Sequence, residues 1–209
     1  MVHSAYSEWK AQNLNGYLTP ELRPRGLRDG ELDFFVRLAA KNGGPVLELA
    51  SGAGRILMVL AEAGFEVFGI EASEHMLVLA KKAITLTSVD AQKRIHLIQG
   101  DMRQFAFRRK LPLIIIPYHS FWFNFDKNHE GLRDDCLLGA YHSEAEQCIQ
   151  SITEALDSGG IFVIDTPRMF EESAWWDGMA KKHGFSYQVE NPYEGWARPI
   201  EVLVGRKSY

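Results

Sequence analysis

The sequence predicts an α/β fold, with a doubly wound, mostly parallel seven-stranded sheet and a C-terminal antiparallel hairpin. Short apolar runs rich in β-branched residues alternate along the chain with longer segments of helical period, which is the pattern of βαβ units. A turn containing two glycines joins the first of these runs to the first helical segment. The last two runs are joined by a loop containing Pro and Gly, which favours a closing hairpin.

The first half of the chain supplies three of the expected strands. Val46–Leu49 is the first strand, and Arg55–Ala63 follows it as a helix whose apolar residues fall on one face. Glu66–Ile70 is the second strand, and Glu74–Ala83 is the next helix. Ile95–Gln99 is the third strand. This half of the chain therefore reads as successive parallel strands joined by helices.

The second half supplies the other four strands. Leu113–Ile116 is entirely apolar, as expected for a strand covered on both faces. Ser143–Leu156 has helical period and is expected to end at Gly159-Gly160, before a fifth strand at Ile161–Asp165. The hairpin strands are expected at Phe185–Glu190 and Ile200–Arg206.

The chain length of 209 residues suits one domain with a sizeable core, so we expect residues 1–209 to form a single domain. Residues 45–209 would form its core. Residues 1–44 contain several Pro and Gly residues and would form short helices and loops that serve as a lid. A second weakly periodic stretch, Tyr118–His142, follows the fourth strand, and long segments of this kind tend to be lids or binding loops.

Composition narrows the class of protein. Lys and Arg number 23 against 27 Asp and Glu, a net charge of −4 with His neutral, so a nucleic-acid partner is not expected. No apolar run approaches the ~18 residues of a membrane span, and no signal peptide is recognisable. Cys136 and Cys148 form no CxxC pair, which indicates reduced thiols rather than a metal site. We therefore expect a cytoplasmic protein that uses neither a membrane nor a metal.

The turn between the first strand and the first helix carries the first sign of a ligand. Gly52 and Gly54 allow a sharp turn and a close approach of a ligand to the backbone. The amides that open the following helix at Arg55 can then face a polar group of that ligand. A dinucleotide fingerprint would also have Gly at position 57, where this chain has Leu57, so a pyrophosphate on this helix is disfavoured.

Two further acids follow the next two strands. Glu71 ends the second strand, where a carboxylate can accept hydrogen bonds from both hydroxyls of a ribose; the alternative is an acid that caps the next helix, for which Ser73 is the better candidate. Asp101 follows the third strand, where it can accept the exocyclic amine of adenine, with Met76 or Met102 against the ring. Three consecutive strands that each end in a polar group indicate an adenosine ligand.

Five stretches resemble the successive motifs of class I S-adenosylmethionine-dependent methyltransferases with a Rossmann-like fold. These stretches are VLELASGAGR, FGIEASEHMLVLAKK, LIQGDM, LPLIIIPYHSF and LDSGGIFVIDTP, and they extend from about Pro45 to Asp165. The resemblance is strongest to the members that methylate small molecules. It implies an enzyme that uses S-adenosyl-L-methionine, releases S-adenosyl-L-homocysteine and methylates an O or N atom of a small-molecule acceptor.

The resemblance also implies roles for individual residues. Glu48, Ala50 and Gly52 would surround the methionyl part of the cofactor. Glu71 would hold the ribose, with Ala72 and Met76 beside the adenosine, and Asp101 and the Met102 amide would contact adenine. Ile116 and Pro117 would border the sulfonium and its methyl group. The family often has Asp where this chain has Glu71, a longer carboxylate that still reaches a diol.

Substrate handling is less determined by the sequence. His119 and Tyr118, after the fourth strand, are the candidates for a base or a substrate contact, should the acceptor carry a proton. Many small-molecule members have a long insert after the fifth strand, whereas here only Thr166–Gly184 lies there. Two other hypotheses about the function remain. One is a non-catalytic protein of this fold that binds the cofactor or a partner, and the other is a nicotinamide oxidoreductase, which Leu57 and Asp101 disfavour.

Overall fold

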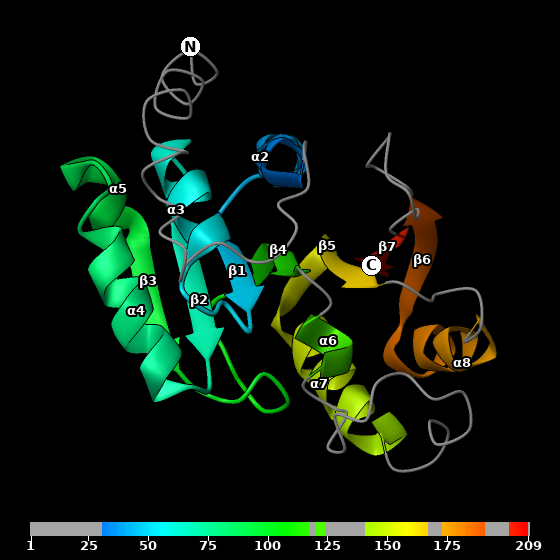
Figure 1. Cartoon of the computed structure of the whole chain (residues 1–209). Helices are drawn as coiled ribbons and strands as arrows, with labels where there is room; N and C mark the ends of the chain where they lie inside the picture. Colours follow the sequence, from blue (N-terminus) through cyan, green and yellow to red (C-terminus); the bar gives the residue numbers. More distant parts are fainter. Residues whose placement is uncertain (1–30, 118–119, 124–140, 167–172, 191–200, 209) are drawn as a thin grey trace. The chain divides into compact units, whose positions relative to one another are not determined.

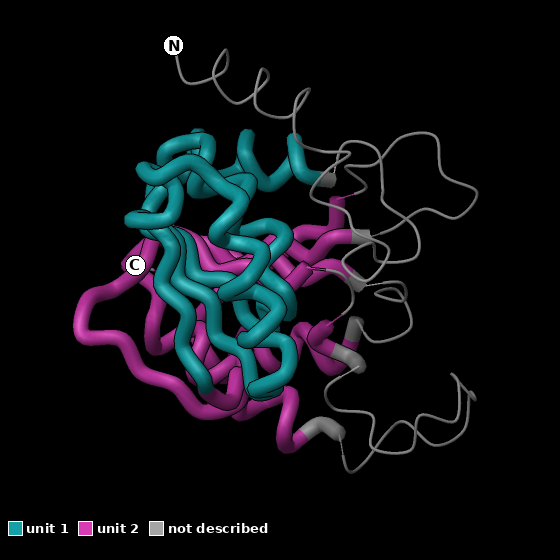
Figure 2. The backbone as a smooth tube through the Cα atoms, turned by 60° about the vertical axis from the view of Figure 1, so that its left-hand side comes forward, with its two compact units in different colours: residues 1–99 teal, residues 100–209 magenta. Residues whose placement is uncertain are grey.

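The computed structural model describes residues 31–117, 120–123, 141–166, 173–190 and 201–208. The chain divides into two compact units, residues 1–99 and residues 100–209, which Figure 2 shows in different colours. Each unit combines strands with the helices that pack on them. Among the described residues, no helix has the length and apolar character needed to cross a membrane.

The first unit contains a parallel three-stranded arrangement in the order β3-β2-β1. Its strands are β1 (Val46–Leu49), β2 (Val67–Glu71) and β3 (Ile95–Gln99). Its helices are α2 (Glu31–Asn42), α3 (Arg55–Glu62), α4 (Glu74–Ile84) and α5 (Val89–Arg94), labelled in Figure 1. Parallel pairing brings the carboxyl ends of these strands to one edge, where Glu71 of β2 is the register partner of Gln99 of β3.

Helix α3 is buried more completely than its sequence pattern predicts. Its apolar residues were expected on one face, yet every residue from Ile56 to Ala61 is buried. Met58 packs in a cluster with Ala83, Ile84 and Ile95, so a second face of the helix is also covered. Burial all around is the property of a helix in the middle of a core.

The two helices after β2 begin at serine caps. The Ser73 hydroxyl accepts a hydrogen bond from the Met76 amide at 3.3 Å, so the prediction that Ser73 caps α4 is confirmed. The Ser88 hydroxyl accepts one from the Ala91 amide at 3.2 Å at the start of α5. Glu62 of α3 receives bonds from both the amide and the hydroxyl of Ser88, which ties α5 to α3.

The second unit contains four strands in the order β4-β5-β7-β6. They are β4 (Leu111–Ile116), β5 (Leu156–Thr166), β6 (Phe185–Glu190) and β7 (Glu201–Lys207). The helices of this unit are α6 (Ser120–Phe123), α7 (Tyr141–Ala155) and α8 (Ser173–His183). β4 pairs parallel with β5, while β7 pairs antiparallel with both β5 and β6. The predicted fold class, a mostly parallel seven-stranded sheet with a C-terminal antiparallel hairpin, is confirmed.

Some expectations about individual elements were wrong. Gly159 and Gly160 do not end a helix, because α7 stops at Ala155 and both glycines lie inside β5. A Cβ at Gly160 would lie 3.0 Å from the Leu111 carbonyl oxygen, so glycine is needed there for close approach to β4. Helices α5 and α8 were not predicted.

The N-terminal segment contains a longer helix than expected. Residues 31–42 form α2 rather than short pieces, and Leu32, Phe35, Val36 and Ala39 on it are buried. Residues 1–30 lie outside the described residues, so the proposed lid remains a prediction.

Candidate functional site

The turn between β1 and α3 has the unusual backbone that its glycines suggest. Gly52 and Gly54 have φ values of 53° and 81°, and Ala50, which has a side chain, also adopts a positive φ of 52°. The Ser51 amide donates to the Ile70 carbonyl at 3.1 Å, and the Gly54 amide donates to the Ser51 carbonyl at 2.9 Å. A residue with a side chain in the left-handed region carries strain of the kind found at ligand-binding turns.

The Glu71 carboxylate, at the end of β2, links this turn to the start of α4 by hydrogen bonds. Its Oε2 accepts the Gly52 amide at 2.8 Å, and its Oε1 accepts the Ser73 amide at 2.8 Å. A carboxylate has about four acceptor positions, two on each oxygen. Each oxygen therefore keeps one position for another donor, which is the arrangement needed for a pair of neighbouring hydroxyl groups.

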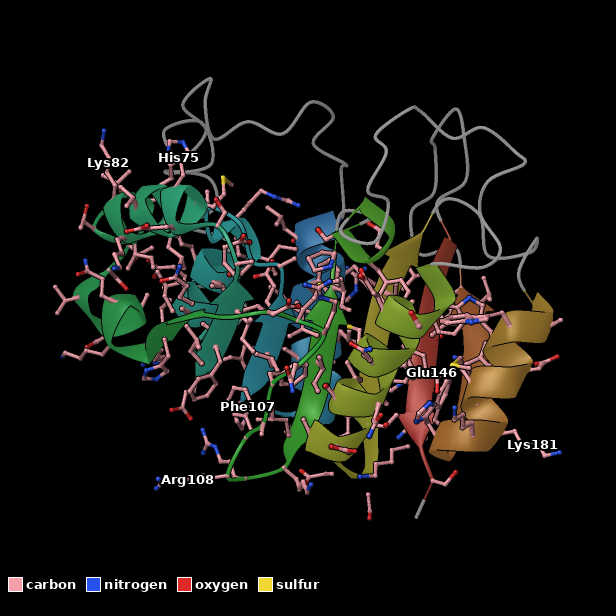
Figure 3. The ribbon with its side chains drawn as sticks, turned by 90° about the horizontal axis from the view of Figure 1, so that it is seen from below. His75, Lys82, Phe107, Arg108, Glu146 and Lys181 are labelled. Carbon is pink, nitrogen blue, oxygen red and sulfur yellow. The ribbon has the colours of Figure 1, made fainter. Side chains whose placement is uncertain are left out.

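The space in front of Gly52 is bounded by Met76 of α4. A Cβ built on Gly52 would lie 3.4 Å from the Met76 Cε, so even an added methyl group would already touch this methionine. Ala72 is exposed and Met76 is half-buried. Figure 3 shows that His75 and Lys82 of the same helix point away from the strands, so neither faces this turn.

Leu57 occupies the position at which a dinucleotide fingerprint requires glycine, and the structure gives a reason. The side chain is fully buried over Gly69 of β2, where an added Cβ would lie 2.4 Å from the Leu57 Cδ1 and 2.7 Å from the Ser51 Oγ. In this chain the glycine at the close approach is therefore Gly69 of the strand, and the helix has the Leu57 side chain instead of a glycine. Glu48 is buried at the end of β1, and Arg55 opens α3 in a half-buried position.

Asp101 belongs to the second unit and has its own set of contacts. Its Oδ1 accepts the Arg103 amide at 2.8 Å, and the Arg103 Nε lies 2.9 Å from each carboxylate oxygen. Arg103 Nη2 also contacts Oδ2. These bonds from Arg103 hold the pKa of the Asp101 carboxyl below its ordinary value. Met102, between them, is buried.

The remaining predicted residues lie at or after the end of β4. Ile116 is fully buried, and Pro117 is buried directly after it. The Pro117 carbonyl accepts the Ser120 amide at 3.3 Å, which begins the short helix α6. Tyr118 and His119, the candidates for a base, lie outside the described residues.

The first unit thus brings four of the residues singled out in the sequence, Gly52, Glu71, Ser73 and Met76, into contact with one another through the contacts described above. Asp101, Met102, Ile116 and Pro117 lie in the second unit. Arg103 was not predicted from the sequence, although the spacing Asp-x-Arg could have suggested its pairing with Asp101. Ser51 was not predicted either; its buried hydroxyl has no hydrogen-bond partner among the described residues.

Comparison with protein families gives a match over residues 40–196 to a family described as "Methyltransferase domain". Among curated proteins, the chain is 44% identical over 70 residues to the "Putative methyltransferase YqeM" of Bacillus subtilis. That match covers 34% of this chain and only 26% of the Bacillus protein, so the chain matches about a quarter of that relative's length.

Solved structures share the fold across most of the chain. The glycopeptide N-methyltransferase MtfA, complexed with sinefungin, has a TM-score of 0.66 at 16% identity and covers 85% of this chain and 87% of its own. The CcbJ methyltransferase of Streptomyces caelestis has a TM-score of 0.68 at 18% identity, with coverage of 88% and 97%. CalS10 of Micromonospora echinaspora, an amino pentose methyltransferase with S-adenosylmethionine bound, has a TM-score of 0.63 at 16% identity, with coverage of 89% and 93%.

Proposed function

Because the chain belongs to the methyltransferase domain family, we propose that it is an enzyme that moves a methyl group from S-adenosyl-L-methionine to an O or N atom of a small-molecule acceptor. S-adenosyl-L-homocysteine is the second product. The observation that carries the proposal is the turn at Gly52, held by the Glu71 carboxylate, whose oxygens each keep an acceptor position.

The residues of the first unit fit the cofactor. Glu71 accepts the two ribose hydroxyls, for which its free acceptor positions are suited. Gly52 has no side chain to fill the space that Met76 bounds, and Ala72 and Met76 offer apolar surface to the adenosine. Glu48, Ala50, Gly54 and the amide of Arg55 surround the methionyl part. In the second unit, Asp101 and the Met102 amide would contact the adenine, and Ile116 and Pro117 would border the methyl group.

The chain's part in the reaction is mainly to align the acceptor atom with the methyl group and to keep water out of the site. When bound, S-adenosyl-L-methionine supplies a methyl group on a positively charged sulfur that is already activated for in-line displacement. The protein then has to hold the acceptor atom in line and exclude water. His119 or Tyr118 takes a proton from the acceptor when that atom carries one at the working pH.

The acceptor class is supported by the neighbours of known structure. MtfA is a glycopeptide N-methyltransferase and CalS10 an amino pentose methyltransferase, so both modify molecules other than nucleic acids. The acidic balance of the chain agrees with such an acceptor. We propose, as the sequence suggests, that this enzyme acts in the cytoplasm.

Binding and turnover experiments test the proposal. Calorimetric titration is expected to show binding of S-adenosyl-L-methionine and S-adenosyl-L-homocysteine and none of NAD(H). Incubation with methyl-labelled cofactor and a panel of small amines, alcohols and amino sugars is expected to give a labelled product and S-adenosyl-L-homocysteine. Failure of both sulfur compounds to bind at millimolar concentration contradicts the proposal. Binding of both without turnover on a broad panel favours the non-catalytic alternative.

A further inference from the structure

Arg103 engages the Asp101 carboxylate more completely than a surface ion pair requires. Its Nε lies 2.9 Å from both oxygens, its Nη2 contacts Oδ2, and its own backbone amide donates to Oδ1 at 2.8 Å. Three N–H groups therefore make four contacts with the two carboxylate oxygens, and the Nε–H is shared between them. Because that one N–H serves both oxygens and the Asp101 side chain is 42% exposed, the carboxylate can still accept one N–H of an exocyclic amine.

The same arginine is anchored to helix α7. Its Nη1 lies 3.0 Å from the Glu144 Oε2, and its carbonyl accepts the Ser151 hydroxyl at 2.9 Å. Glu144 and Ser151 are seven residues apart, so they lie on one side of α7, two turns from each other. The side chain and the backbone of Arg103 are thus both held by one helix. Because the guanidinium is planar, its hydrogen bonds to Asp101 then fix the orientation of the carboxylate.

An ionised carboxylate accepts hydrogen bonds and donates none. It therefore suits the amine of adenine and opposes the carbonyl oxygen that hypoxanthine has at the same position. This selection depends on two conditions, namely that the carboxylate stays ionised and that its oxygens are held in a fixed orientation. A flexible or protonated Asp101 would accommodate either base.

We propose that Arg103 is a positioning residue that orients the Asp101 carboxylate for the exocyclic amine of the cofactor's adenine, and thereby makes the enzyme select adenosine over inosine compounds. The inference rests on the proposed function, because it needs a cofactor whose adenine meets Asp101. It adds a residue that does not touch the cofactor and acts through the carboxylate it holds.

The test compares S-adenosyl-L-homocysteine with S-inosyl-L-homocysteine, which differs only at the base, by calorimetric titration of the full chain. Loss of a hydrogen bond to a charged partner corresponds to a preference of about tenfold to a hundredfold for the adenosine compound in the unmodified protein. In Arg103→Met the preference is expected to fall to about twofold or less, because the Asp101 carboxylate loses the guanidinium N–H groups that orient it. Arg103→Lys, which keeps the charge without the planar fork, is expected to lie between them.

Two control variants keep the result interpretable. Arg108→Met removes an exposed arginine of the same loop, which Figure 3 shows at the tip, away from the strands, and the preference should stay unchanged. Glu144→Gln weakens the anchor of Arg103 without touching Asp101, so it should lower the preference below that of the unmodified protein without abolishing it. If Arg103→Met does not fold, this variant still tests the inference, because an unchanged preference in folded Glu144→Gln protein would contradict it.

The outcomes separate the inference from the function on which it rests. An unmodified protein that binds neither compound contradicts the proposed function and the inference together. An unmodified protein that binds both equally contradicts the contact of Asp101 with adenine. The third outcome is that the unmodified protein prefers the adenosine compound and Arg103→Met keeps the full preference. In that case Arg103 has only a structural role and the inference is wrong, whether or not the variant binds both compounds more weakly than the unmodified protein does.

Discussion

At the scale of single residues, the two carboxylates of the proposed cofactor site are held in different ways. Glu71 receives only backbone amides, from Gly52 and Ser73, so its negative charge is not balanced by these neutral donors. Asp101 receives an arginine, which balances its charge and shares one N–H between the two carboxylate oxygens. The first arrangement suits a pair of hydroxyl donors and the second suits one amine donor.

The Asp101–Arg103 pair should make stability depend on pH in the acid range. The pKa of Asp101 in the folded chain is lowered from 3.8, mainly by hydrogen bonds from Arg103. Its contribution is therefore fully present above that value and is lost as pH falls through the lowered pKa. The urea midpoints of the unmodified protein and Arg103→Met should differ most near pH 6 and converge as the pH falls below 3.8.

The expected difference is small, because the Arg103 and Asp101 side chains are 36% and 42% exposed and solvent screens the pair. Arg108→Met provides the control and should show no such convergence. A difference between the unmodified protein and Arg103→Met that stays constant down to about pH 2 would show that the arginine stabilises the fold by packing alone.

Cys148 of α7 should be chemically inert in the folded protein. Its side chain is fully buried, and burial, followed by the nearby Asp101 charge, raises the pKa of its thiol. In a Cys136→Ser chain, an aromatic disulfide reagent at about pH 8 should leave the native thiol unmodified over minutes and react at once after unfolding in urea. Rapid reaction of the native thiol would contradict this burial.

At the scale of elements, a glycine makes room for an aromatic ring between two strands of the second unit. Gly205 of β7 is the register partner of Phe162 of β5. A Cβ at Gly205 would lie 2.1 Å from the Phe162 Cζ and 2.2 Å from its Cε1. The ring is fully buried and packs edge-on against Phe185, so its packing must shift to admit an added Cβ.

Gly205→Ala should therefore destabilise the protein by about 1–3 kcal/mol, the usual cost of overpacking a core. Urea unfolding monitored by circular dichroism measures this loss. Gly178→Ala is the matched control, since nothing lies within 4 Å of the added Cβ on α8. Alanine favours a helix interior over glycine, so that control should be unchanged or more stable by up to about 1 kcal/mol. Equal effects of the two substitutions would contradict the packing described here.

Periodicity and residue type predicted several strands closely. Ile95–Gln99 and Phe185–Glu190 were predicted with the boundaries that the structure has, because polar or turn-forming residues flank each segment. β5 begins earlier than predicted, since Gly159-Gly160 was interpreted as a helix stop and in fact serves a close approach to β4. Short-range signals cannot distinguish these two uses of glycine.

At the scale of the whole molecule, the fold and the family follow from the order of the motifs, since each motif is local to one strand end and its turn. The roles of the cofactor-binding residues were predicted in the same way and still await a test. The spacing Asp-x-Arg carries only the local pairing of Arg103 with Asp101, whereas the anchoring of Arg103 depends on Glu144 and Ser151, and the setting of Ser51 depends on Gly69 of β2. Tertiary contacts of this kind leave little trace in one sequence.

The central claim, that the turn at Gly52 and the Glu71 carboxylate bind an adenosine cofactor, is tested most directly by titrating S-adenosyl-L-homocysteine into the unmodified protein and into Glu71→Gln and Glu71→Ala. We expect binding to the unmodified protein and a loss of affinity of about tenfold to a hundredfold in Glu71→Gln, with a larger loss in Glu71→Ala. Unchanged affinity in folded Glu71→Ala protein would contradict it.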